Sequence, residues 1–144
     1  MKYINEIEIN KSVDKVIALF DNSDNLEKWM EGLQSFVHIK GIPGQVGSKS
    51  LLKFKVGKRE IEMIETITVR NLPHEFSGTY ESKGVFNTVK NKFIDLPGQR
   101  TKYVSEQEFK LKGFMKLFGL LMPGVFKKQS MKYLTAFKSF AEKT

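Results

Sequence analysis

The sequence predicts an α+β fold in which a curved, seven-stranded antiparallel sheet wraps around a long C-terminal helix, with two short helices after the first strand. Three observations predict it. Apolar side chains recur at every second position through most of residues 34–111, and turn residues interrupt them at strand-length intervals. In residues 126–142 the apolar side chains recur at helical spacing instead, which places them on one face of a helix and the lysines on the other. One strand pattern and two short helical patterns precede them.

The composition is typical of one globular domain. The chain has 144 residues, of which 40% are hydrophobic and 28% charged, and it has no cysteine. A chain of this length buries enough surface to form a core without disulfides, so we expect residues 1–144 to form a single domain. The lack of cysteine excludes disulfides, thiol nucleophiles and cysteine-ligated zinc.

The charge balance is basic, with 24 lysines and arginines against 16 acidic residues and a net charge of +8. Such a charge is compatible with nucleic acid or an anionic membrane as partner. The only arginines, however, are Arg59, Arg70 and Arg100, and arginine is the residue that most often contacts bases and phosphates. We therefore interpret the charge mainly as a solvated lysine surface, and we do not expect nucleic acid as a partner.

The first residues of the chain predict a strand. Residues 3–9 alternate apolar and polar side chains, unlike the continuous apolar core of a signal peptide. The longest apolar stretch, residues 117–126, is interrupted by Pro123 and Gly124, and it is far shorter than the roughly 20 residues that span a bilayer. We therefore expect a cytoplasmic protein.

Two short helices are predicted directly after this strand. Ser12 lies where it can cap the first, whose apolar residues follow helical spacing to residue 20. Asp24 and Glu27 form the pattern of a capping box for the second, and Gly32 lies where that helix should end. Trp29 belongs to its apolar stripe, and we expect it at the junction with the long helix, near the edge of a pocket.

Short connections between the later strands favour an antiparallel meander. One helix cannot fill the width of a strongly curved sheet, so we expect a cavity between the sheet and the C-terminal helix. The remaining strands are expected at about 34–41, 48–56, 59–70, 74–82, 85–95 and 100–111.

Several motifs along the chain carry a resemblance to a known family. They are NLEKWM (residues 25–30), GQVGS (44–48), ETITVRNLP (65–73), GVFN (84–87), Thr101 and the closing helix pattern of 126–142. With these, nearly the whole chain resembles the START-like or SRPBCC superfamily, which includes polyketide cyclases/dehydrases, lipid-transport proteins and the birch-pollen-allergen fold. The resemblance implies a helix-grip fold and the binding of a sterol, lipid, polyketide or hormone; since only some members are enzymes, it implies no particular activity.

The sequence offers little for metal, nucleophilic or phosphate chemistry. The only histidines are His38 and His74, and neither has a second ligand at helical or hairpin spacing. There is no nucleophile elbow or evident Ser-His-Asp set, and the glycines at 41, 44 and 47 are typical of hairpin turns. We expect no metal and no cofactor.

Glu65 is an acidic residue among apolar ones, because in the strand 59–70 it shares a face with Met63. Burial would raise the pKa of its carboxyl group, and it could then act as a general acid or base in a cyclase or dehydratase, as could Tyr80 or Tyr103. A β-bulge that turns Glu65 outward is the interpretation we favour. No catalytic residue is therefore predicted.

Neutral polar side chains occupy the lysine-free faces of the last two strands. A buried polar group costs on the order of 1–3 kcal/mol if unpaired, so these groups need a ligand, water or one another, and the choice stays open. Together with aromatic candidates, the residues predicted to contact a ligand are Trp29, Met63, Glu65, Tyr80, Asn87, Asn91, Phe93, Tyr103, Gln107, Phe109, Phe114, Phe118, Phe126 and Tyr133.

Residues 113–126 are apolar nearly all round, and lysines flank them at 110, 112, 116, 127 and 128. One interpretation is a lid buried against the sheet and the short helices. The other is a gate at the cavity mouth that contacts anionic membranes transiently.

The function that the sequence favours is the binding or transport of a small hydrophobic or amphipathic molecule in an internal cavity. The alternative is a cyclase or dehydratase that uses an acid or base in the cavity. A further alternative is an interaction module that binds an acidic protein or nucleic acid through the lysine-rich face of the last helix. The sequence does not name the ligand.

Overall fold

The computed structural model describes residues 1–144. Seven strands and a set of helices follow one another along the chain, and the strand pattern agrees closely with the one expected. The elements are β1 (Lys2–Ile9), α1 (Val13–Phe20), the 3-10 turn η1 (Ser23–Asn25), α2 (Leu26–Trp29), β2 (Leu33–Lys40), β3 (Lys49–Val56), β4 (Arg59–Asn71), β5 (Glu75–Ser82), β6 (Val85–Leu96), β7 (Arg100–Leu111), α3 (Phe114–Leu121) and α4 (Gly124–Lys143).

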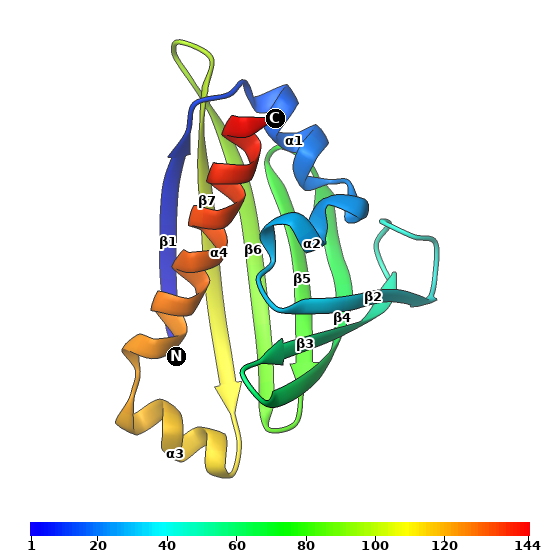
Figure 1. Ribbon diagram of the computed structural model, residues 1–144, viewed down its shortest axis with the longest axis vertical. Helices are drawn as coiled ribbons and strands as arrows, with labels where there is room; N and C mark the ends of the chain where they lie inside the picture. Colours follow the sequence, from blue (N-terminus) through cyan, green and yellow to red (C-terminus); the bar gives the residue numbers. More distant parts are fainter.

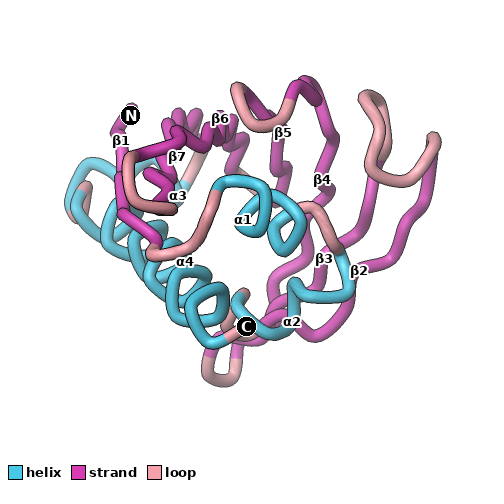
Figure 2. Tube along the Cα trace, turned by 90° about the horizontal axis from the view of Figure 1, so that it is seen from above, coloured by secondary structure: helices cyan, strands magenta, loops and turns pink.

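The seven strands form one antiparallel sheet in the order β1-β7-β6-β5-β4-β3-β2. Strands β2 to β7 follow one another as hairpins, and β1 joins the far edge beside β7. In Figure 1, α4 runs along β1 and β7, α1 and α2 lie at the upper end, and α3 lies at the lower end. Figure 2 shows the sheet curving around the helices. The predicted helix-grip architecture is confirmed.

The first short helix begins as predicted, because Ser12 Oγ accepts a hydrogen bond from the backbone amide of Lys15 over 3.4 Å. The predicted capping box of Asp24 and Glu27 is wrong. Asn22 Oδ1 accepts a hydrogen bond from the backbone amide of Asp24 over 3.0 Å and caps η1. The helix α2 begins only at Leu26, and no side chain caps it.

Gly32 forms the turn between α2 and β2 instead of ending the helix directly. Its φ is +86°, and a Cβ atom there would lie 2.7 Å from the carbonyl oxygen of Lys55 on β3. The left-handed backbone and this close approach both require glycine. Leu33 then follows as the first residue of β2.

Two hydrophobic clusters stabilise the fold, and the partly buried Leu26 and Met30 pack against both. In the larger one, the fully buried Phe137 of α4 packs its ring edge-on against Trp29, with ring centroids 5.0 Å apart. The larger cluster consists of Ile9, Val16, Trp29, Phe93, Tyr103, Leu134, Phe137 and Ala141. The smaller cluster consists of Leu33, Leu52 and Phe54, on β2 and β3.

Candidate functional site: a cavity between the sheet and the helices

A cavity of about 1230 Å³ lies between the concave face of the sheet and the helices α3 and α4. Of its 34 lining residues, 20 are hydrophobic, and members of both hydrophobic clusters contribute to the wall. Ligand pockets are typically about 300–1,000 Å³ and mostly apolar, so the space is large enough for a sizeable organic molecule.

On the sheet side, the wall of the cavity includes every second side chain along much of β6 and β7. Asn87 and Asn91 of β6 line the cavity, whereas Lys90 between them is exposed on the opposite face. On β7, Gln107 and Phe109 line it in the same way, and Asn87 pairs with Phe109 across the two strands. The inward face predicted for these strands is therefore the observed one.

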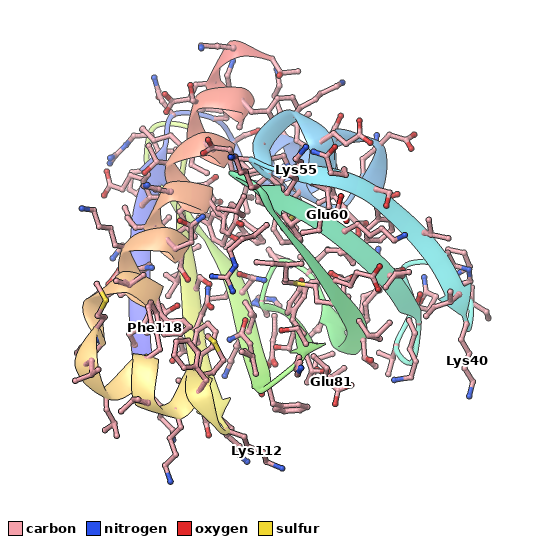
Figure 3. All side chains as sticks on the ribbon, turned by 60° about the horizontal axis from the view of Figure 1, so that its bottom comes forward. Lys40, Lys55, Glu60, Glu81, Lys112 and Phe118 are labelled. Carbon is pink, nitrogen blue, oxygen red and sulfur yellow. The ribbon has the colours of Figure 1, made fainter.

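The opposite wall comes from α3 and α4. Met115 and Phe118 of α3 and Phe126 and Tyr133 of α4 line the cavity. The Phe126 ring lies 4.8 Å from the Phe109 ring and 5.9 Å from the Phe118 ring, so aromatic side chains join α3, α4 and β7 at this end. Figure 3, which brings this end forward, shows Phe118 on the side of the two helices and Glu60 on the strands across from it.

Most polar groups of the wall pair with one another. The Tyr3 hydroxyl lies 2.5 Å from Ser130 Oγ, which joins β1 to α4. Gln107 Nε2 donates to Ser105 Oγ over 3.3 Å, and Asn87 Nδ2 donates to the carbonyl oxygen of Glu108 over 3.2 Å. Of the three partners left open by the sequence, namely a ligand, water or one another, the structure favours pairing within the protein for these residues.

The pair of Asn91 and Tyr103 leaves the amide nitrogen of Asn91 free. The Tyr103 hydroxyl donates to Asn91 Oδ1 over 3.2 Å, deep in the protein, and burial raises the pKa of Tyr103, which therefore stays neutral. The Asn91 amide nitrogen donates to no protein group, although Asn91 lines the cavity. This nitrogen can donate a hydrogen bond to a carbonyl or hydroxyl oxygen of a bound molecule.

Glu65 is partly buried and shares the concave face of β4 with Ile61 and Met63, which line the cavity, so the expected outward turn is wrong. Its cross-strand partner Tyr80 donates a hydrogen bond to Glu65 Oε2 over 2.7 Å. The irregularity in the β4–β5 register lies between Ile67 and Val69, beyond Glu65, and therefore does not reverse its side chain.

Burial sets the electrostatics of this pair. It raises the pKa of the Glu65 carboxyl group, while the hydrogen bond from Tyr80 lowers it to a smaller extent. Burial and the neighbouring carboxylate raise the pKa of Tyr80 well above its usual value. Tyr80 lines the cavity but Glu65 does not, so a bound molecule meets the tyrosine oxygen rather than the carboxylate.

All the residues predicted to contact a ligand line this cavity except Glu65 and Phe93. Phe93 instead lies inside the larger cluster, with its ring 4.7 Å from Tyr103 and 4.9 Å from Phe20. Trp29 occupies the expected junction of α2 and α4, is 5% exposed, and lines the cavity. That any of these side chains contacts a ligand remains a prediction.

Sequence reasoning missed part of the wall. Leu52 and Phe54 alternate with lysines on β3, and this signal could have identified them. Gln129 and Ser130 also line the cavity, but nothing in the pattern of α4 distinguishes them from solvated polar residues. Their position depends on how α4 is rotated over the sheet.

The segment between β7 and α4 is not the buried lid that was one interpretation of its sequence. Phe114, Leu120 and Leu121 of α3 are 73%, 74% and 72% exposed. The helix touches the rest of the protein on one side only, where Gly119 packs against Leu111. It lies beyond the lower end of the sheet, so no strand covers its outer face (Figure 1).

No group of three or more His, Asp or Glu side chains lies close enough together to hold a metal ion. None of the helices has the length and apolar character needed to cross a membrane. No family model matches the sequence. A search of curated proteins finds no match either.

Solved structures match almost the whole chain at low identity. Ara h 8.0201 matches with a TM-score of 0.78 and 15% identity, covering 100% of this chain and 99% of that one. An aromatase/cyclase from a Streptomyces species matches with a TM-score of 0.80 and 11% identity, covering 99% and 93%. Norcoclaurine synthase from Thalictrum flavum matches with a TM-score of 0.75 and 14% identity, covering 97% and 85%. The chain therefore has the same helix-grip fold as these solved structures.

Proposed function

We propose that the protein binds a small hydrophobic or amphipathic molecule, lipid- or polyketide-like, in the cavity between its sheet and α4. The observation that carries the proposal is a mostly apolar space of about 1230 Å³ in the position of a core. Close packing is the rule in protein interiors, so side chains around an empty space of this size lack attractive contacts that a ligand can supply. Burial of apolar ligand surface contributes roughly 25 cal/mol per Å².

Polar groups on the wall support an amphipathic ligand. The free Asn91 nitrogen and the Tyr80 oxygen can orient a ligand oxygen or hydroxyl group inside the cavity. Charged side chains of both signs line the cavity, among them Arg59, Glu60 and Lys112, and these favour a polar end of the ligand directed outward. Norcoclaurine synthase, which shares the fold, has been solved with dopamine and hydroxybenzaldehyde bound.

The second candidate is a cyclase or dehydratase, and the Tyr80–Glu65 hydrogen bond is the observation that favours it. Binding is better supported, because the hydroxyl hydrogen of Tyr80 is already donated to Glu65 and the carboxylate does not reach the cavity wall. Saturable turnover that is lost in Tyr80→Phe would identify an enzyme. Its absence with binding intact leaves the binding function.

We place this function in the cytoplasm. We also propose that the ligand is exchanged during transient contact with an anionic membrane. The support for that contact is the exposed apolar surface of α3 beside the open end of the cavity.

The binding function can be tested with a fluorescent apolar probe, anilinonaphthalene sulfonate, and with native mass spectrometry of the purified protein. Val85 lines the cavity, and Ile94 lies on the opposite face of the same strand, 41% exposed. We expect Val85→Trp to weaken probe binding at least tenfold and the matched control Ile94→Trp to leave it unchanged. Equal binding to both variants, or no binding to the wild type, would overturn the proposal.

A further inference from the structure

We propose that α3 docks the protein on an anionic bilayer, with its exposed apolar side chains in the lipid interface, so that the cavity mouth faces the membrane. The inference rests on the proposed ligand-binding function and adds to it how α3 inserts, how the cavity mouth is oriented on the membrane and the route of the ligand. It also identifies the partner by charge: a surface of negatively charged phospholipids rather than a neutral one.

The outer face of α3 is an apolar patch without a partner in the structure. The patch consists of Leu117, Leu120, Leu121 and Met122, with Phe114 at its border with the cavity, and these side chains are between 50% and 74% exposed. Large apolar side chains gathered in this way on one short helix mark a contact surface in most proteins. A helix that lies in the interface plane inserts only one such face, so the eight residues of α3 are sufficient.

The inner face of the same helix belongs to the cavity. Met115 and Phe118 line it, and Gly119 lies so close to Leu111 that a Cβ atom there would be 2.5 Å from Leu111 Cδ1. The lining continues along the turn that leads into α3, through Lys112, Gly113 and Phe114. A membrane in contact with the outer face of α3 therefore lies next to the opening, and a lipid-like molecule can enter without crossing bulk water.

The charges next to the patch in the sequence are of one sign, whereas the acidic residues at this end of the molecule come from the strands: Glu60 and Glu62 line the cavity, and Glu81 shares a surface pocket with Lys112. Residues 109–141 contain seven lysines and no aspartate or glutamate. Lys112, Lys116, Lys127 and Lys128 are close to the patch in sequence, and none of them forms an ion pair within the protein. Lysines at the edge of an inserted apolar face can reach lipid phosphates with their ammonium groups.

This charge distribution favours a membrane over a second copy of the chain. If two copies docked through the same patch, the lysines beside the patch in one copy would lie close to those of the other. Each chain also carries a net charge of +8. Like charges brought together in this way oppose association. A bilayer that contains anionic lipid offers both an apolar interior and negative charge at its surface.

Vesicle co-sedimentation tests the proposal, with phosphatidylcholine vesicles that contain 30% phosphatidylserine or none. We expect the wild type to pellet with the anionic vesicles at low salt and to be released by high salt. Leu120→Glu/Leu121→Glu should lower the partition coefficient at least tenfold, as should Lys127→Glu/Lys128→Glu. Ile42→Glu is the matched control: Ile42 is 72% exposed, as Leu121 is, but lies in the β2–β3 loop, and this variant should pellet like the wild type.

The outcomes separate docking from ligand binding. Each variant is also titrated with anilinonaphthalene sulfonate in the absence of vesicles, and the part of the signal that Val85→Trp removes reports on the cavity. Wild-type protein that stays in the supernatant while it still binds the probe overturns docking and leaves the binding function. Undiminished pelleting of Leu120→Glu/Leu121→Glu, or a dimer in the wild type that this variant abolishes, also overturns docking. Failure of the wild type to bind the probe overturns the binding function instead.

Discussion

Removal of the Tyr80 hydroxyl group should destabilise the protein in a pH-dependent way. Tyr80 donates to Glu65 Oε2 over 2.7 Å, in surroundings where burial raises the pKa of the carboxyl group. A hydrogen bond to a charged group contributes about 1.5–3 kcal/mol, more than one between neutral groups. For Tyr80→Phe we therefore expect the free energy of unfolding at pH 8 to fall by about 2 kcal/mol. This corresponds to a decrease in Tm of about 6 °C for a domain of this size.

The sign of the pH dependence follows from the raised pKa of Glu65. Between the unfolded and the folded pKa, the native protein holds a proton that the unfolded chain has lost, so stability falls as the pH rises through this range. The range begins near pH 4.3, about the pKa of an unfolded glutamate. The hydrogen bond from Tyr80 lowers the pKa of Glu65 in the folded protein. Without this bond the folded pKa is higher, so the pH range over which stability falls extends to higher pH. The cost of Tyr80→Phe should therefore be smallest near pH 4 and largest near pH 8.

Urea unfolding followed by circular dichroism between pH 4 and pH 8 measures this cost. Glu65→Gln is the control, because its amide oxygen still accepts the bond but carries no proton to lose. This variant should have a shallower pH dependence than the wild type, and Tyr80→Phe added to it should have the same cost at every pH. A cost of Tyr80→Phe in the wild-type background that is equal at pH 4 and pH 8 would refute the reasoning.

Other parts of the structure allow further tests. The Trp29 fluorescence should change when a ligand enters the cavity that it lines; a ligand that binds without this change would contradict its proposed place at the pocket. Asp21→Asn should cost about 1 kcal/mol at low salt and less at high salt, because Arg70 contacts both carboxylate oxygens, at 2.7 and 2.6 Å; a salt-independent cost in denaturant unfolding would exclude this explanation. Gly78→Ala should lower the free energy of unfolding by about 1–3 kcal/mol, since its Cβ would lie 2.9 Å from the Thr66 carbonyl oxygen; an unchanged Tm would show that the strands separate freely.

Much of the sheet could be predicted from the sequence because alternation is a local property. The lysines at positions 90 and 92 identified the outer face of β6, and this placed Asn87 and Asn91 on the inner one. Helical spacing in the last segment likewise predicted which face of α4 is buried, including Phe137. In each case a single strand or helix contains the whole signal.

Features that depend on distant contacts could not be predicted. The pairing of Tyr3 with Ser130 joins residues at opposite ends of the chain. The exposure of α3 depends on where the sheet ends, because an all-round apolar pattern is compatible both with burial and with an external contact. The sequence also could not decide which side chain caps the second helical segment. Asn22 and the Asp24–Glu27 pair lie within a few residues of one another, and either can accept hydrogen bonds from the first backbone amides of that segment.

The division of the core into two clusters has a consequence for how the molecule opens. Residues of both clusters line the cavity, and Leu26 and Met30 are the only apolar side chains that pack against both, so few contacts join the clusters. Amide hydrogens of β2 and β3, which carry the smaller cluster, should exchange with solvent before those of β6 and β7. A molecule that fills the cavity contacts both clusters. It should therefore slow the hydrogen exchange of β2 and β3 in proportion to the fraction of protein that has it bound. The ligand then acts as a structural part of the core, and its free concentration sets how often this half of the sheet opens.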